Sequence, residues 1–327
     1  MRERILALLL QAPDRYISGE DIAQRLGITR AAVWKHMDAL KKLGCELESK
    51  PNCGYRLLHV PDSLAPEILS TYDFSGTLKR CHFHYTQQTD STNDLAKRLA
   101  VKGAPDATIV VTEAQTHARG RLARPWTGEP GTSLMFSLLL RPKMRPSDAP
   151  KISLIAALAV ARAIQTQTGL APKLKWPNDV LVEGRKICGI LTEMSAECDG
   201  IEYVVCGVGI NVNQKQFPLE LRTIATSAYL ECKRETSRGQ MLLVFLTQFF
   251  ALYDAYLATE DFAPVISEYA KQSALIGKTV TIEAFGKKSE GKCIGFDRDG
   301  CLVIEQEGKR KRVVAGDVSV RGEGLYV

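Results

Sequence analysis

Arg119, Arg121 and Arg124 lie within six residues of one another. They separate two apolar runs, Thr108–Val111 and Ser133–Leu140, whose β-branched and aliphatic residues predict strands. A connection this basic between two buried strands must face water or an anion, because burying unpaired charge is costly. Arginine presents a planar fork of donors that fits carboxylates and phosphates. The segment is therefore either a solvated turn or an anion-binding loop.

A second cation, Lys175, lies inside the apolar segment Leu174–Val180. Pro177 and the pair Asn178-Asp179 predict a turn after a short strand, which places Lys175 near a strand end. A lysine in such surroundings needs a counter-charge. It is either a structural ion pair or a second contact for the same anion.

Neutral polar residues and glycines extend this set of candidates. Ser91, Thr92 and Asn93 open a predicted helix, Asp94–Val101, and a cap is the simplest role for them. In the strand Ile201–Asn213, glycines alternate at positions 207 and 209. Alternating glycines remove side chains from one face, so that another backbone or a flat ligand can lie against it.

The first sixty residues predict a winged helix-turn-helix. Helices are expected over Arg2–Gln11, from Ser18 through Leu26, and over Arg30–Leu43, followed by a hairpin of Cys45–Ser49 with Tyr55–Leu58. Basic residues gather on the third helix and the wing, which favours DNA binding over a purely protein-binding role. The candidate DNA contacts are Ser18, Thr29, Arg30, Ala31, Trp34, Lys35, Lys41 and Lys50.

The remaining chain predicts two further domains after a linker, residues 61–79. Residues 80–272 combine hairpins with a long helix from a Ser147 cap to Thr168 and with helices Met241–Leu257 and Pro264–Ser273. This pattern indicates an α+β domain, a mixed sheet with helices on one side. Residues 273–327 predict a small barrel of short strands, Thr279–Ala284, Gly291–Asp297, Cys301–Glu305 and Lys311–Val314.

Composition excludes several classes of protein. The 327 residues include 45% hydrophobic and 24% charged residues, as in ordinary globular proteins. No run reaches the apolar length of a bilayer-spanning helix, and the first residues do not resemble a signal peptide. Nine scattered cysteines indicate no disulfide framework and, with His82 and His84 lacking a third ligand nearby, no metal site is expected. We expect a cytoplasmic protein.

Three segments in order resemble the signatures of biotin protein ligases. They are Gln115 with Arg119-Gly120-Arg121, then Lys175-Trp176-Pro177-Asn178-Asp179, then Gly207-Val208-Gly209-Ile210-Asn211. With the winged helix in front (residues 1–60), nearly the whole chain resembles the bifunctional form, biotin ligase and biotin operon repressor in one polypeptide. The resemblance implies a class II synthetase-like central domain and an SH3-like C-terminal barrel. The loop departs from the family's pattern, because Ala118 and Ala123 stand at two glycine positions.

The resemblance also implies an activity. ATP and Mg²⁺ would convert biotin to biotinyl-5'-AMP, and biotin would then pass to a lysine of the biotin carboxyl carrier protein of acetyl-CoA carboxylase. The adenylate would act as corepressor by favouring a homodimer that binds operator DNA. Lys175 and Arg121 would be catalytic. Biotin would contact Ser91, Thr92, Asn93, Gln115, Arg119, Gly120, Arg121, Trp126, Lys175, Gly207 and Gly209, and ATP or the adenylate would contact Arg119, Arg121, Lys175, Asn178 and Asn211.

Two other functions remain open from the residues alone. One is a transcription factor that senses a small acid without catalysis, which would not need a phosphate clamp of arginines and lysine. The other is a lipoate-type ligase, which the DNA-binding front and the Lys-Trp-Pro-Asn-Asp segment disfavour.

Overall fold

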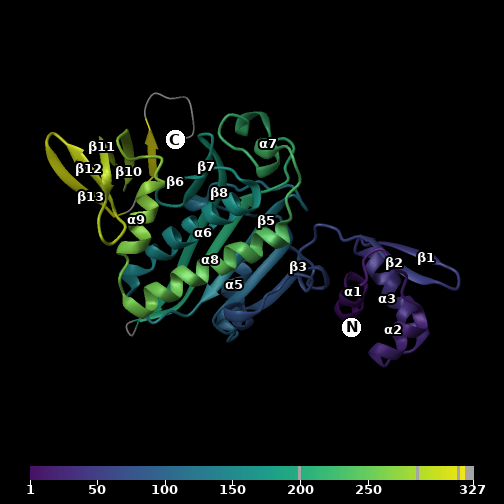
Figure 1. Cartoon of the computed structure of the whole chain (residues 1–327). Coiled ribbons are helices and arrows are strands. Elements are labelled where there is room, and N and C mark those ends of the chain that lie inside the picture. Colours follow the sequence, from purple (N-terminus) through teal and green to yellow (C-terminus); the bar gives the residue numbers. More distant parts are fainter. Residues whose placement is uncertain (198–199, 285–286, 315–316, 321–327) are drawn as a thin grey trace. The chain divides into compact units, whose positions relative to one another are not determined.

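The computed structural model describes residues 1–197, 200–284, 287–314 and 317–320. It forms two compact units, residues 1–74 and residues 75–327. The first unit contains α1 (Arg2–Leu10), α2 (Gly19–Leu26), α3 (Arg30–Lys42), the antiparallel pair β1 (Glu46–Lys50) and β2 (Gly54–His59), and α4 (Pro66–Leu69). This is the predicted winged helix-turn-helix (Figure 1).

The helices of the first unit begin and pack as their sequence predicts. The hydroxyls of Ser18 and Thr29 accept hydrogen bonds from backbone N–H groups in the first turns of α2 and α3. Val33, Met37 and Leu40 form the buried face of α3. Segment 61–79, predicted as a linker, contains α4, which contacts α1 and is joined to it by an ion pair of 2.9 Å between Arg2 and Glu67.

A seven-stranded mixed sheet forms the centre of the second unit. Its strands are β3 (His82–Thr89), β4 (Thr108–Gln115), β5 (Ser133–Leu140), β6 (Lys173–Lys175), β7 (Asp179–Val182), β8 (Arg185–Glu197) and β9 (Gly200–Asn211). Their order is β3-β4-β5-β9-β8-β7-β6. Only β3 and β4 run parallel among these pairs, and the long β8–β9 hairpin carries Gly209 opposite Gly189.

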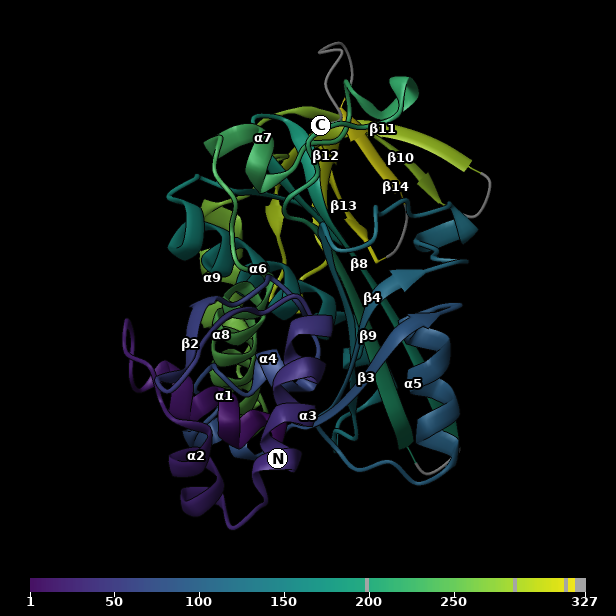
Figure 2. The same ribbon diagram turned by 90° about the vertical axis from the view of Figure 1, so that its right-hand side faces the viewer.

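Helices cover both faces of this sheet, so the expectation of helices on one side is wrong. On one face α5 (Thr92–Val101) packs over Val110, Leu139 and Val205. Neighbouring strand residues point to opposite faces. Phe136 on β5 accordingly faces away from α5 and contacts Phe245 of α8 (Arg238–Thr259), with ring centroids 5.0 Å apart. Figure 2 shows α5 on one side of the sheet and α6 (Pro150–Thr168) with α8 on the other.

Two helices differ from their predictions. The long helix α6 begins at Pro150, and Ser147 lies in a preceding 3-10 turn, Pro146–Asp148. Proline favours the first helical turn, so Pro150 sets this start better than the serine. Helix α8 has the length and apolar composition of a bilayer-spanning helix, contrary to expectation. It packs against α6 and β5, which is where its apolar residues are buried.

The chain ends in a five-stranded antiparallel sheet, which we call the C-terminal sheet. It consists of β10 (Thr279–Ala284), β11 (Lys287–Phe296), β12 (Leu302–Gln306), β13 (Lys309–Val313) and β14 (Asp317–Val320), in the order β13-β12-β11-β10-β14. The sequence predicted the first four and missed β14. Helices α7 (Ala228–Cys232) and α9 (Ala263–Lys271) complete the second unit.

Candidate active site

The loop that carries the arginines is a closed turn between β4 and β5. The backbone N–H of Trp126 donates to the Ala118 carbonyl at 2.9 Å, and the backbone N–H of Gly120 donates to the Arg124 carbonyl at 2.8 Å. Leu122 at its tip has a φ of 54°, in the left-handed region. Ala118, at one of the family's glycine positions, does not have a positive φ. Alanine is therefore tolerated at position 118 in this conformation.

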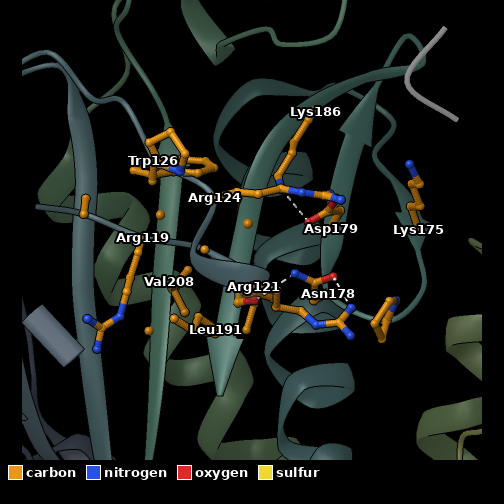
Figure 3. A pocket seen from close by; sticks show the side chains of 18 of the residues that line it. Arg119, Arg121, Arg124, Trp126, Lys175, Asn178, Asp179, Lys186, Leu191 and Val208 are labelled. Carbon is orange, nitrogen blue, oxygen red and sulfur yellow. Dashed lines mark hydrogen bonds and ion pairs between the residues drawn. The ribbon is translucent and has the colours of Figure 1, made fainter. Parts of the chain in front are cut away.

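One cavity of about 500 Å³ brings the two cationic segments together. Both Arg121 and Lys175 line it. The two segments are in direct contact, because Nη1 of Arg121 donates to Oδ1 of Asn178 at 3.4 Å (Figure 3). Asn178 is itself fixed to β8, where its side-chain amide donates to the Ile190 carbonyl at 3.0 Å. The Ile190 N–H returns a hydrogen bond of 3.0 Å to the Asn178 carbonyl.

The cavity has an excess of positive charge. Among the described residues, its lining includes six basic side chains, Arg119, Arg121, Arg124, Lys175, Lys186 and Lys288, and two acidic ones, Asp179 and Glu283. Lys186 pairs with Asp179 at 2.7 Å, and the Arg124 side chain extends toward the same carboxylate in Figure 3. Lysine and arginine in this number suit a ligand with several anionic oxygens.

Sequence reasoning missed several of these residues. Lys186 follows Arg185 at the start of β8, so no apolar run singled it out, and its Nζ lies 5.7 Å from the Trp126 ring centroid. Thr281, Glu283 and Lys288 come from the C-terminal sheet. Their approach depends on how two parts of the chain pack, which no local pattern encodes.

A second group of lining residues has neutral polar side chains. The side-chain oxygen of Gln115 accepts from the Thr92 N–H at 2.7 Å. The Ser137 hydroxyl lies 2.6 Å from Oδ1 of Asn93 and 2.8 Å from Oγ1 of Thr92. The hydroxyl of Ser91 caps α5. These side chains are held in fixed orientations, and Ser91, Thr92, Asn93 and Gln115 all line the cavity.

The glycines of β9 have a more specific function than expected. A Cβ at position 207 would lie 2.1 Å from Oδ1 of Asn93, and a Cβ at position 209 would lie 2.8 Å from Cε2 of Trp126. Gly207 and Gly209 therefore make room for these two side chains, whereas the sequence suggested room for another backbone or a flat ligand. The indole N–H of Trp126 has no hydrogen-bond partner among the described residues. A ligand acceptor would satisfy it.

Two predicted ligand contacts are engaged elsewhere. The Arg119 guanidinium pairs with Asp94 at 2.7 Å, and Figure 3 shows it directed away from Arg121. Asn211 does not line the cavity. Its amide donates to the Thr226 carbonyl at 3.0 Å, so it fixes the loop that follows β9. Asn211 ends the strand whose glycines face the cavity, which suggested that it contacts the ligand. The sequence alone did not reveal that its side chain binds the loop instead.

A buried ion pair lies at the base of the arginine loop. Arg238, 1% exposed at the start of α8, donates to Oε2 of Glu113 at 2.7 Å and to the Ser133 carbonyl at 3.3 Å. Glu113 lies near the end of β4, and Ser133 begins β5. Arg238 therefore holds both ends of the loop.

The candidate DNA contacts lie in the first unit. All eight, Ser18, Thr29, Arg30, Ala31, Trp34, Lys35, Lys41 and Lys50, are exposed. Trp34 is 62% exposed on α3, which is unusual for so large an apolar side chain. Arg30 makes an exposed ion pair with Glu20 at 3.6 Å, and water screens such a contact strongly.

Comparisons with known proteins match three parts of the chain. Residues 85–211 match the Biotin/lipoate A/B protein ligase family. Residues 2–56 match an HTH domain, and residues 275–321 match the Biotin protein ligase C terminal domain. These parts correspond to the central sheet, the winged helix and the C-terminal sheet.

Individual relatives extend these matches over the full length. The bifunctional ligase/repressor BirA of Bacillus spizizenii is 35% identical over 322 residues, which is 98% of each chain. The biotin–[acetyl-CoA-carboxylase] ligase of Paracoccus denitrificans is 32% identical over 240 residues, 72% of this chain and 99% of the relative. A solved biotin protein ligase from Aquifex aeolicus in complex with biotin and ATP superposes with a TM-score of 0.65 at 29% identity, covering 74% of this chain and 99% of the other.

Proposed function

This chain belongs to the family of bifunctional biotin protein ligases and repressors, and from that premise we propose that it biotinylates a carrier protein and represses transcription. The observation that carries the ligase activity is the hydrogen bond between Arg121 and Asn178 in a cationic cavity that Lys175 also lines. The exposed basic face of α3 supports the repressor activity.

The chemistry explains why two cationic segments are needed. A carboxylate is a poor electrophile, so ATP must first convert biotin to biotinyl-5'-AMP with loss of pyrophosphate. The carboxylate and the α-phosphate repel each other as they approach. Lys175 and Arg121 offset that repulsion, and their effect grows as charge develops on the phosphate oxygens in the transition state.

The neutral polar residues of the cavity lining are suited to the ureido ring of biotin. That ring offers two N–H donors and one carbonyl acceptor, and Ser91, Thr92, Asn93 and Gln115 provide both types of partner. Trp126 covers the apolar part of the ligand and offers its indole N–H, which has no partner among the described residues. Gly120, Gly207 and Gly209 border the same space. Arg119 joins the phosphate contacts once it exchanges Asp94 for the ligand.

Magnesium fits this site as a partner of the nucleotide. Mg²⁺ takes oxygen ligands and keeps several waters, so it needs only one or two carboxylates beside phosphate oxygens. Asp179 and Glu283 are the carboxylates in the described part of the cavity lining. When bound, the ion would neutralise charge on the departing pyrophosphate.

The second step and the regulation follow from the intermediate. The lysine of a biotin carboxyl carrier protein would attack the adenylate, releasing AMP. When little carrier is available, the adenylate would persist and favour a homodimer in which two winged helices bind a palindromic operator. Because this proposal requires ATP and DNA, we propose that both activities take place in the cytoplasm.

A direct assay tests the ligase proposal against its alternatives. The protein is incubated with ATP, Mg²⁺ and either biotin or lipoate, and acyl-adenylate is measured by mass spectrometry. We expect biotinyl-5'-AMP and no lipoyl-AMP. Preferential formation of lipoyl-AMP would identify a lipoate-type ligase, and a folded protein that forms neither adenylate would be a small-acid sensor without catalysis.

A further inference from the structure

Both neighbours of Lys175 are held by residues far along the chain. The Leu174 N–H donates to the Gln272 carbonyl at 2.8 Å, and the Ala274 N–H donates to the Leu174 carbonyl at 2.8 Å. On the other side, the indole N–H of Trp176 donates to the Gly300 carbonyl at 3.0 Å. Trp176 is 4% exposed, so this hydrogen bond is shielded from water.

Gly300 belongs to the turn between β11 and β12, which is fixed internally. The Gly300 N–H donates to the Asp297 carbonyl at 3.0 Å. The Asp297 carboxylate accepts from the N–H groups of Asp299 and Cys301, each at 2.9 Å. A turn with this many internal hydrogen bonds presents its carbonyl to Trp176 in one orientation.

The same turn is pressed against the helices of the central domain. Gly300 has a φ of +83°, and a Cβ there would lie 2.5 Å from Cδ1 of Leu154 on α6 and 3.1 Å from Cε1 of Phe262. Asp299 also approaches the buried ammonium of Lys151 at 3.6 Å. No residue other than glycine fits between the turn and α6 without movement.

We propose that the C-terminal sheet positions Lys175 for adenylate formation, and that Trp176 and the Gly300 turn transmit this constraint. This inference rests on the proposed function. The backbone of this segment carries the Lys175 side chain, so a shift of that backbone displaces the ammonium from its ligand. Because a shift of about 1 Å can cost a hundredfold in rate, fixing the two flanking residues contributes directly to catalysis. Trp176 is a positioning residue that acts through Lys175.

The test uses two substitutions on opposite sides of the hydrogen bond and one matched control. Trp176→Phe keeps an aromatic ring and removes the N–H donor. Gly300→Ala displaces the turn. Gly308→Ala is the control, because Gly308 is also a positive-φ glycine in a turn of the C-terminal sheet, and its added Cβ would meet no described atom within 4 Å.

The measured quantity is biotin-dependent exchange of pyrophosphate into ATP, as kcat and as KM for biotin. We expect Trp176→Phe and Gly300→Ala each to lower kcat about tenfold with little change in KM, the scale of one lost hydrogen bond. Gly308→Ala keeps the wild-type kcat. Thermal unfolding of each variant reports folding, and if Gly300→Ala does not fold then Trp176→Phe decides the question.

A double-mutant cycle separates positioning from a general structural effect. Because Trp176 acts through Lys175, Trp176→Phe in a Lys175→Ala background should lower kcat by less than about twofold. A full tenfold loss in that background would overturn the inference and leave the ligase proposal intact. A Lys175→Ala variant with wild-type kcat would instead remove Lys175 from the mechanism.

Discussion

The positions of two side chains in this site depend on the glycines that face them. Asn93 reaches the cavity only because position 207 has no side chain, and Trp126 lies over β9 because position 209 has none. The alternating glycines signalled a special surface in the sequence. Which side chains would occupy it depends on α5 and the arginine loop, neither of which is near β9 in the sequence.

Gly207→Ala should weaken biotin binding. The added methyl would lie 2.1 Å from the Asn93 amide oxygen, while Asn93 is held by Ser137, Leu191 and Glu193. Moving Asn93 breaks these hydrogen bonds, so we expect the Kd for biotin to rise at least about tenfold. Isothermal titration calorimetry measures the change.

Gly19→Ala is the control for that experiment, because its methyl would meet only Tyr55 at an ordinary 3.5 Å. An unchanged Kd in Gly207→Ala would mean that Asn93 does not contact biotin or that it moves without cost.

The charged residues show what the sequence reveals and what it hides. Lys175 and Arg121 were recognisable because cations interrupt apolar segments, and such cations need a partner. Lys186 lacks this signal, because it follows Arg185 on a strand of a hairpin, where an exposed lysine is the simpler interpretation. The direction of Arg119 toward Asp94 is set by α5 and cannot be read from its own loop.

Elements in this fold are fixed at their ends. The arginine loop is anchored by Arg238, whose side chain is almost fully buried together with Glu113. The sequence predicted the helix that contains Arg238 but placed its start three residues later. A buried arginine at a helix start has no local signal, because its partner lies more than a hundred residues away.

Glu113→Gln should destabilise the protein markedly. It leaves the Arg238 guanidinium buried without its carboxylate, a loss of about 3–5 kcal/mol in the free energy of unfolding. Urea unfolding monitored by fluorescence gives the change. The matched control is Glu235→Gln, which removes the exposed pair with Lys215 at 3.3 Å and should cost less than about 1 kcal/mol. Equal losses in the two variants would contradict the anchoring function.

The ion pair between Asp90 and Arg98 lies at the start of α5, and its contribution to stability depends on pH. Hydrogen bonds from the Arg98 guanidinium and from the Ser91 N–H hold the pKa of Asp90 below its usual range. A carboxylate with a lowered folded-state pKa stabilises the protein above its unfolded pKa, about 4, and loses that effect as pH falls toward the folded pKa.

Asp90→Asn should therefore lower the Tm at pH 7. The difference in Tm from wild type should narrow progressively below about pH 4, where wild-type Asp90 begins to lose its advantage. Differential scanning calorimetry of both proteins at several pH values gives the Tm difference at pH 7 and its change at lower pH. A Tm difference that stays constant down to about pH 3 would show that the carboxylate charge is not what stabilises α5.

At the scale of the whole molecule, the sequence predicted the domains and most of their elements better than it predicted how those elements pack together. The winged helix, the mixed sheet and most strands of the C-terminal sheet follow from periodicity and turn residues. The faces covered by helices, and the approach of Lys288 and Glu283 to the cavity, follow from packing between distant segments. Local patterns do not contain that information.

The winged helix should bind DNA through residues that adenylate formation does not require. Arg30→Ala combined with Lys35→Ala removes two exposed charges from α3 and should weaken binding to a duplex that the wild-type protein selects from a random library. The logarithmic salt dependence of binding should become less steep by up to about 2, because each removed cation neutralises about one phosphate fewer. Fluorescence anisotropy at several salt concentrations measures it.

Adenylate formation by the same double variant should match wild type, because both residues lie in the first unit. Unchanged DNA affinity and salt dependence would show that α3 does not contact the phosphate backbone.

The most direct measurement is biotin-dependent pyrophosphate exchange in Lys175→Ala and in Arg121→Ala. Lys173→Ala serves as control, since Lys173 lies on the same strand as Lys175 and is exposed. If these two cations bring the biotin carboxylate and the α-phosphate together, each of the first two variants should lose at least about a hundredfold in rate, and Lys173→Ala should match wild type. Near-normal pyrophosphate exchange in Lys175→Ala would show that Lys175 does not bring the biotin carboxylate and the α-phosphate together.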